Sequence, residues 1–190
     1  MVRDEAVLGA IITIWVFPDE ASYMRGTSAI LGTVTNAGYG WGTLVHEMVH
    51  AFMDGDFPDA PVWMKEGLAS LFEAPREEAG HLRGAVNWRL TQLQQALAAG
   101  KAPSFARMAD AGRGKFSGKE EALYYAMARY VCFYLQERGL LLRFYRAFRG
   151  RVSADRNGLA TLQDKTSRDL VSLRADWERF VADLRYERPR

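Results

Sequence analysis

Two apolar runs near the start of the chain predict β-strands. The first, LGAIITIWVF at residues 8–17, is rich in β-branched and aromatic residues, which favour extended structure. Pro18 follows it directly, and proline cannot continue a central strand. The second run, AILGTVTN at residues 29–36, has the same character, and the glycine-rich NAGYGWG at 36–42 predicts a loop after it. We therefore expect a small β-sheet at the front of the chain.

The rest of the chain carries apolar residues at helical spacing. Helices are predicted at about 43–53, 62–73, 82–100, 103–110, 120–139, 140–150 and 167–185. The first two are separated by DGDFPDAP, and Pro75 stops the second. The helix at 120–139 is apolar on nearly all sides, which predicts a buried, central position. The last helix is expected to open with Thr166 and Asp169 in the spacing of a capping box.

The order of these elements predicts an α+β fold in one domain, residues 1–190. A small N-terminal β-sheet and the helix that packs on it would occupy 1–53, and a mainly α-helical part would occupy 54–190. With 48% hydrophobic and 25% charged residues, the composition is that of a globular chain. Its single cysteine, Cys132, cannot form an internal disulfide and is expected in the core.

The absence of targeting signals and the pattern of charge argue against a membrane protein, a secreted protein and a nucleic-acid-binding protein. The run at 8–17 is too short for a membrane span, and Asp4 and Glu5 precede it without a small-residue cleavage site after it. We therefore expect neither a membrane span nor a signal peptide, which favours a cytoplasmic location. The basic stretch RFYRAFRGR at 143–151 has no nucleic-acid-binding motif beside it. It is interpreted as a solvated helix face, so no nucleic-acid partner is expected, and the oligomeric state is left open.

Candidate chemistry is concentrated in LVHEMVHAFM at residues 44–53. Two of the three histidines in the chain, His46 and His50, are four residues apart and therefore share one helical face. Two imidazoles on one face suit a zinc ion, and Glu47 beside them can take a proton from a water that the ion activates. This is the physical basis of the H-E-x-x-H signature. Five residues with three fixed positions can also arise by chance. However, the apolar residues around them predict a buried helix, where polar side chains need partners.

A second stretch, WMKEGLASLFE at residues 63–73, resembles the third-ligand helix of the gluzincins, a class of zinc metallopeptidases. It is especially close to the W-x-x-E-G-x-A segment of zinc aminopeptidases and of the peptidase MA-like family. The resemblance implies that Glu66 completes a Zn²⁺ site with His46 and His50, on a helix antiparallel to the H-E-x-x-H helix. The loop between the helices is rich in glycine, proline and aspartate, which supports this packing. The small residues Gly67 and Ala69 permit the two helices to approach each other closely.

Asp56 is the alternative third ligand. It lies six residues after His50, where a metzincin-type pattern places its last ligand. That pattern requires glycine at position 53, however, and this chain has Met53. Glu66 is therefore preferred as the third ligand. The alternative without a function is that Glu66 is an ordinary solvated glutamate on a helix.

The resemblance extends into the C-terminal half of the chain. ALYYAMARYVCFYLQERG at 122–139 is similar to the tyrosine-led helix of the peptidase MA-like family, and Leu135 sets a register in which Tyr125 leads. In related aminopeptidases such a tyrosine helps to stabilise the oxyanion, which implies a catalytic role for Tyr125. Tyr124 is the alternative, and core packing of either residue remains open.

The chain also departs from the pattern. Thermolysin-like enzymes have an acidic residue four positions after the third ligand, which supports a ligand histidine, and here that position is Ser70. Glu73 is an available carboxylate nearby, although an exposed helix residue is the preferred interpretation. His81 is interpreted as a surface histidine. Trp41 and Trp63 are interpreted as packing residues that flank the motifs.

The aminopeptidase G-A-M-E-N-like strand is absent from this chain. TVTNAGY at 33–39 occupies the comparable position, and it could pair with an extended peptide as an edge strand. It offers no acidic residue to hold a free amino terminus. The sequence therefore predicts an endopeptidase-like zinc metallopeptidase acting on a peptide or protein. The alternative is a catalytically inactive zincin-like module for binding or scaffolding.

Overall fold

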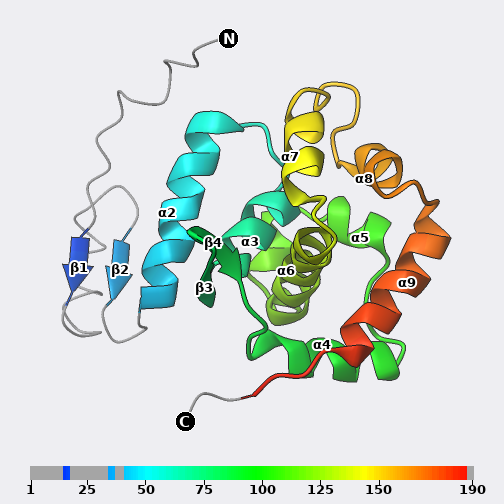
Figure 1. The fold of residues 1–190 in the computed structure, drawn as a ribbon, viewed down its shortest axis with the longest axis horizontal. Helices are drawn as coiled ribbons and strands as arrows, with labels where there is room; N and C mark the ends of the chain where they lie inside the picture. The colour runs from blue at the N-terminus through cyan, green and yellow to red at the C-terminus, as the bar shows by residue number, and fades with distance from the viewer. Residues whose placement is uncertain (1–14, 18–33, 37–40, 188–190) are drawn as a thin grey trace.

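The computed structural model describes residues 15–17, 34–36 and 41–187, and this part of the chain is mostly helical (Figure 1). Its helices are α2 (Trp41–Asp56), α3 (Val62–Leu71), α4 (Arg89–Ala98), α5 (Phe105–Ala109), α6 (Glu121–Glu137), α7 (Leu141–Arg149), α8 (Leu159–Thr166), α9 (Leu170–Asp183) and the 3₁₀ helix η3 (Arg113–Phe116). Its strands are β1 (Trp15–Phe17), β2 (Val34–Asn36), β3 (Pro75–Glu78) and β4 (His81–Gly84). The fold is α+β, as predicted. None of the described helices is long and apolar enough to cross a membrane.

The first pair of strands lies beside α2, the helix that carries the H-E-x-x-H motif. β1 and β2 are parallel, with Trp15 opposite Val34 and Phe17 opposite Asn36, and β2 contacts α2. Figure 1 shows α2 between this strand pair and the remaining helices. The strands occupy the last residues of the two apolar runs. The other residues of the expected strands at 8–17 and 29–36 lie outside the described part of the chain.

The core is built around α6, which is buried along most of its length, as the apolar pattern predicts. It packs against α3, α4, α7 and α9. Its contact with α3 is tight at Gly67, where a Cβ atom would lie 2.9 Å from the carbonyl oxygen of Ala128 and 3.0 Å from the Sγ atom of Cys132. Cys132 is fully buried and free, as expected. This contact fixes α3, and therefore Glu66, against the centre of the molecule.

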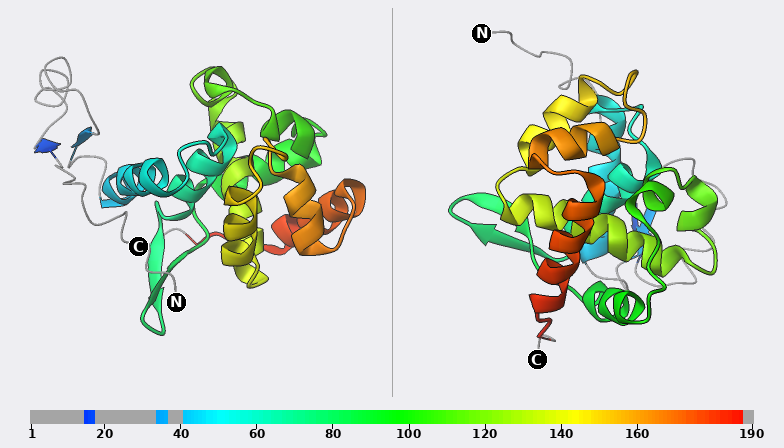
Figure 2. Two further views of the ribbon diagram at one scale, coloured as in Figure 1. Left: turned by 90° about the horizontal axis from the view of Figure 1, so that it is seen from above. Right: turned by 90° about the vertical axis from the view of Figure 1, so that its right-hand side faces the viewer.

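The predicted helix at 82–100 is wrong over its first part. Residues 75–84 form an antiparallel hairpin, in which Glu78 is opposite His81, and helix α4 begins only at Arg89. The turn is made by Ala79 and Gly80, both with positive φ, as a two-residue hairpin turn of type I′ requires. The hairpin projects from the helical body in both views of Figure 2.

A side-chain amide fixes the base of this hairpin. Gln136 of α6 accepts a hydrogen bond from the Gly84 amide at 2.8 Å and donates one to the Gly84 carbonyl at 2.9 Å. A Cβ atom at Gly84 would overlap Leu71 at the end of α3. The base of the hairpin is therefore held against both central helices.

Several element boundaries also differ from the prediction. α2 begins at Trp41, inside the expected loop, and α3 ends at Leu71 rather than at about residue 73. α8 was not predicted. The capping box at the last helix is wrong in one member. Asp169 caps α9 by accepting hydrogen bonds from the backbone amides of Val171 and Ser172, whereas the Thr166 hydroxyl donates to the Leu162 carbonyl at the end of α8.

The close contact at Gly67 makes a testable prediction about stability. Because an added methyl group would overlap the α6 backbone, Gly67→Ala should lower the free energy of unfolding by about 1–3 kcal/mol. Gly55→Ala is a matched control, since it adds the same methyl group to helix α2 at a position where no described atom outside its chain neighbours and the local backbone of that helix lies within 4 Å. Urea unfolding of both variants measures the difference. Equal stability of the two variants would contradict this account of the helix contact.

Candidate metal centre

Three side chains from two adjacent helices converge on one point. His46 and His50 come from successive turns of α2, and Glu66 comes from α3. The segment between the helices is anchored, because Phe57 and Ala60 are buried and the Phe57 amide donates to the Met53 carbonyl at 2.7 Å. This short, fixed connection brings α3 back against α2. His46, His50 and Glu66 can therefore meet although 15 residues separate His50 from Glu66.

The spacing of the three donor atoms fits a metal ion. His46 Nε2 lies 3.1 Å from His50 Nε2 and 3.4 Å from Glu66 Oε2, and the distance from His50 Nε2 to Glu66 Oε2 is 3.3 Å. A tetrahedral zinc ion with bonds of about 2.0–2.1 Å holds neighbouring ligand atoms about 3.3–3.4 Å apart. The three atoms therefore match one face of such a tetrahedron, and the fourth corner is left for another ligand.

The electrostatics of the cluster fit the same interpretation. Glu66 Oε2 is buried and makes no hydrogen bond of good geometry to any described residue. Burial by itself would lower the pKa of His46, but the carboxylates of Glu66 and Glu73 outweigh it and raise that pKa to about 9. Burial would raise the pKa of Glu66, but His46 and His50 lower it to about 2. A buried carboxylate beside a cationic imidazole is a site that a divalent cation can occupy in place of a proton.

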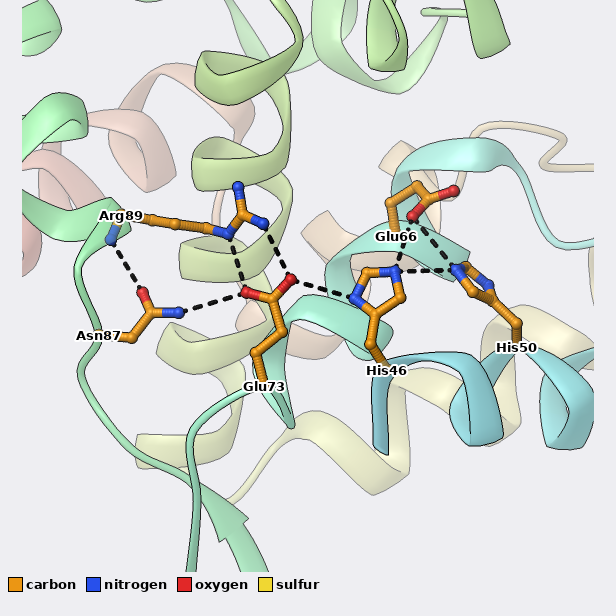
Figure 3. A network of polar contacts seen from close by, with 6 residues as sticks. All are labelled: His46, His50, Glu66, Glu73, Asn87 and Arg89. Atoms are coloured by element: carbon orange, nitrogen blue, oxygen red, sulfur yellow. Dashed lines mark hydrogen bonds and ion pairs between the residues drawn. The ribbon is translucent and has the colours of Figure 1, made fainter. Parts of the chain in front are cut away.

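Glu73 is a fourth member of the cluster, and the expectation that it is an exposed helix residue is wrong. It follows the end of α3, and its side chain is only 9% exposed. Its Oε1 atom lies 3.1 Å from His46 Nδ1 (Figure 3). Because a carboxylate can only accept, Nδ1 must donate, and this leaves Nε2 of the same ring directed at Glu66 and His50.

Two clefts lie against the cluster, and three residues line both of them. One has a volume of about 360 Å³, and the described residues that line it include Val62, Lys65 and Arg113. The other has a volume of about 350 Å³. Both are lined by His46, Glu47 and Tyr125. The candidate base and the candidate tyrosine therefore border both clefts, whereas of the two histidines only His46 does so.

The structure distinguishes Tyr125 from Tyr124, the two tyrosines between which the sequence did not decide. Tyr125 is half-buried, and its ring centroid lies 6.2 Å from that of His46. Burial and the nearby Glu66 carboxylate raise the pKa of Tyr125, so its phenol stays protonated. Tyr124 is 2% exposed and packs edge-on against Phe116 in the core. The first faces the clefts, and the second is a packing residue.

The remaining candidates lie away from the cluster. Asp56 bonds to Tyr145 and Arg149 of α7 rather than joining the histidines, which removes it from the ligand set. His81 is exposed on β4, as predicted. Trp63 is fully buried, as predicted, whereas the side chain of Trp41 lies outside the described part of the structure.

Sequence reasoning missed two polar residues near the centre, Asn87 and Arg89. The Arg89 guanidinium makes two hydrogen bonds to Glu73, and Asn87 contacts both of these residues (Figure 3). Both residues fall inside the segment that was misread as one long helix. No motif in that segment marks them, so spacing alone could not have identified them.

Comparisons with models of protein families, with curated proteins and with solved structures find no match for this chain. The interpretation of the site therefore depends on its geometry and chemistry.

The raised pKa of His46 predicts a coupling between metal binding and protons. With a pKa of about 9, His46 is protonated in the metal-free chain at pH 7, and a metal that takes Nε2 must displace that proton. Zinc affinity should therefore rise as the pH is raised toward 9, and about one proton should be released per ion at pH 7. Calorimetric titration with zinc in two buffers of different ionisation enthalpy measures that number. A binding heat that is identical in both buffers would contradict the assignment.

Proposed function

We propose that this chain is a zinc-dependent metallopeptidase of the gluzincin type, acting on peptide or protein substrates. The observation that carries the proposal is the triangle of donor atoms from His46, His50 and Glu66, with Glu47 and Tyr125 beside the same clefts. The H-E-x-x-H motif and the E-G-x-A motif each predict part of this arrangement from the sequence. Their convergence in space supports a zincin-like fold for this domain.

The donor set favours zinc over other common ions. Two imidazole nitrogens and one carboxylate oxygen are typical of catalytic zinc sites, whereas magnesium and calcium prefer oxygen ligands. Such a site leaves one position open for water or substrate. When bound, zinc would act as a Lewis acid and lower the pKa of a water in the site from 15.7 to roughly 7.

Glu47 is the proposed general base. It follows His46 on α2, lines both clefts and forms no ion pair with any residue that the structure describes. Its carboxylate can therefore accept a proton from the attacking water on one side of the peptide bond. It then delivers that proton to the nitrogen of the leaving amine. A carboxylate tied into a salt bridge would be less available for this transfer.

Tyr125 is the proposed donor to the oxyanion. Its phenol remains protonated because burial and the Glu66 carboxylate raise its pKa. A neutral O–H group can donate a hydrogen bond to the carbonyl oxygen as negative charge develops there, and this donor matters more in the transition state than in the ground state.

The shape of the site supports an endopeptidase-like activity. Two clefts meet at His46, Glu47 and Tyr125 among the described residues, and an extended peptide that occupied both clefts would continue past the reacting bond in both directions. An exopeptidase site closes one side and binds the charged end of its substrate. We therefore propose internal peptide bonds as the substrate.

The role of Glu47 gives a direct test of the proposal. Glu47→Gln preserves the size of the side chain but cannot accept the proton, so it should retain about one zinc per chain and lose hydrolysis by 100-fold or more, at the low end of the roughly 10²–10⁴-fold contribution of a general base. Zinc is measured by metal analysis, and hydrolysis by mass spectrometry of a mixed peptide library. Unchanged cleavage by the variant would rule out this mechanism. Zinc binding by the wild-type chain without cleavage of any peptide would favour the inactive zincin-like module instead.

Tyr125 and Tyr124 provide a matched pair of substitutions. Tyr125→Phe removes a hydroxyl beside the clefts and should lower kcat about 10²-fold, with a smaller change in KM. Tyr124→Phe removes the same hydroxyl from the neighbouring core residue and should leave kcat within about twofold of the wild type. Steady-state kinetics on a cleaved library peptide measures both. Equal losses in the two variants would exclude a specific role for Tyr125.

A further inference from the structure

Arg89, the first residue of α4, contacts two groups of the candidate centre at once. Its Nε atom donates to Glu73 Oε2 at 2.9 Å, and its Nη2 atom donates to Glu73 Oε1 at 2.8 Å. The carbon of the same guanidinium lies 5.0 Å from the centre of the Tyr125 ring. One side chain from outside the two motif helices therefore contacts both the residue that orients His46 and the proposed oxyanion donor.

Glu73 depends on this contact for its position. It comes after the end of α3, so the helix itself does not direct its side chain toward α2. The two parallel hydrogen bonds from Arg89 fix the plane of the carboxylate, and in that plane Oε1 meets His46 Nδ1 at 3.1 Å (Figure 3). The position where a thermolysin-like enzyme has its acidic residue is Ser70, whose buried Oγ atom has no hydrogen-bond partner among the described residues. Glu73 thus supplies, from another position in the sequence, the carboxylate that supports His46, which Ser70 cannot do.

Arg89 is itself anchored to the core. Its backbone amide donates to Asn87 Oδ1 at 3.1 Å. The backbone of Asn87 is bound at both its amide and its carbonyl by the hydroxyl of Tyr130, each at 3.2 Å, and Tyr130 is fully buried on α6. The start of α4 is therefore fixed relative to the central helix. A fixed support of this kind can hold a metal ligand in one orientation.

The charge of Arg89 matters as well as its geometry. The side chains of Glu66 and Glu73 lie on opposite sides of His46, and each is only 9% exposed. Arg89 forms an ion pair with the second of these carboxylates, because its Nη2 atom lies 2.8 Å from Glu73 Oε1. The buried charge of Glu73 is therefore compensated by a cation that lies outside the donor triangle.

We propose that Arg89 is a positioning residue for the metal centre, which acts through Glu73 on His46 and through its ring contact on Tyr125. It touches neither the donor triangle nor the reacting atoms. The inference rests on the proposed function only in taking His46, His50 and Glu66 as a zinc site. It does not require that a peptide is cut.

Zinc affinity tests the proposal without substrate. Arg89→Met and Glu73→Gln should each weaken zinc binding by about 10–100-fold, measured by competition with a chromophoric chelator. If Arg89 acts through Glu73, the zinc affinity of the double variant should be no lower than that of the single variant that binds zinc more weakly. Arg83→Met is the matched control, because Arg83 is also paired with glutamates, Glu78 and Glu137, but lies on the hairpin. It should bind zinc within twofold of the wild type.

Two further measurements separate positioning from a loss of folding. Thermal unfolding of each metal-free variant reports whether the fold is retained. The d–d absorption spectrum of the Co²⁺-substituted chain reports ligand geometry, and it should change in Arg89→Met and Glu73→Gln but not in Arg83→Met. Arg89→Lys keeps the charge without the bidentate contact, so it should recover only part of the lost affinity.

The outcomes distinguish this inference from the proposed function. Zinc binding within twofold of wild type in both Arg89→Met and Glu73→Gln would overturn the inference alone. The inference alone would also be overturned if the losses in zinc-binding free energy of the two single variants added up in the double variant. A wild-type chain that binds no zinc would overturn the proposed function and the inference together. Zinc binding that weakens as expected, with no peptide cleaved by the wild type, would leave the inference standing and contradict the peptidase proposal.

Discussion

The contact between α3 and α6 at Gly67 is the constraint on which the rest of the structure depends. Only a residue without a side chain allows the two backbones to approach so closely, because a Cβ atom there would lie 2.9 Å from a carbonyl oxygen of α6. Glu66 is the neighbouring residue on the same helix, and its carboxylate meets the histidines of α2. The packing of α3 on the core therefore also decides where the carboxylate lies. In this segment, fold stability and site geometry depend on the same backbone.

The candidate centre is organised by the two nitrogens of one imidazole. His46 presents Nδ1 to Glu73 and Nε2 to Glu66, so each ring nitrogen faces a different carboxylate. These contacts have unequal consequences. The first contact fixes the ring, and its carboxylate is balanced by Arg89, whereas the second carboxylate is shared by His46 and His50 and has only these imidazoles as ion-pair partners among the described residues. A divalent cation at the point where the donor atoms converge would take the place of the proton on His46 as the partner of the Glu66 carboxylate.

The sequence predicts the parts of the site that lie on helices better than the parts that connect them. His46 and His50 could be placed on one face from spacing alone, and the E-G-x-A motif located Glu66. The hairpin was missed because Leu82, Val86 and Leu90 have helical spacing, although Leu82 lies on β4. Its turn includes Ala79 in a left-handed conformation, which the sequence does not signal.

The contact between Glu73 and Arg89 could not be predicted for the same reason. It depends on how the chain returns after the hairpin, and no local pattern encodes that path. The fold class needed only the order of apolar segments and was predictable. The contact between His46 and Glu73, in contrast, could be identified only from the tertiary structure.

The hairpin has a consequence for how this chain tolerates change. It leaves the body of the molecule just after Glu73 and returns just before Arg89, and Gln136 and Leu71 hold its base in place. The tip at Ala79 and Gly80 is exposed, and among the described residues no atom other than those of Gly80 and its chain neighbours lies within 4 Å of the position of a Cβ atom at Gly80. Residues added at the tip would extend into solvent while the base stays fixed. This turn is therefore a permissive insertion point, where a tag or a whole domain could be grafted without disturbing the candidate metal centre.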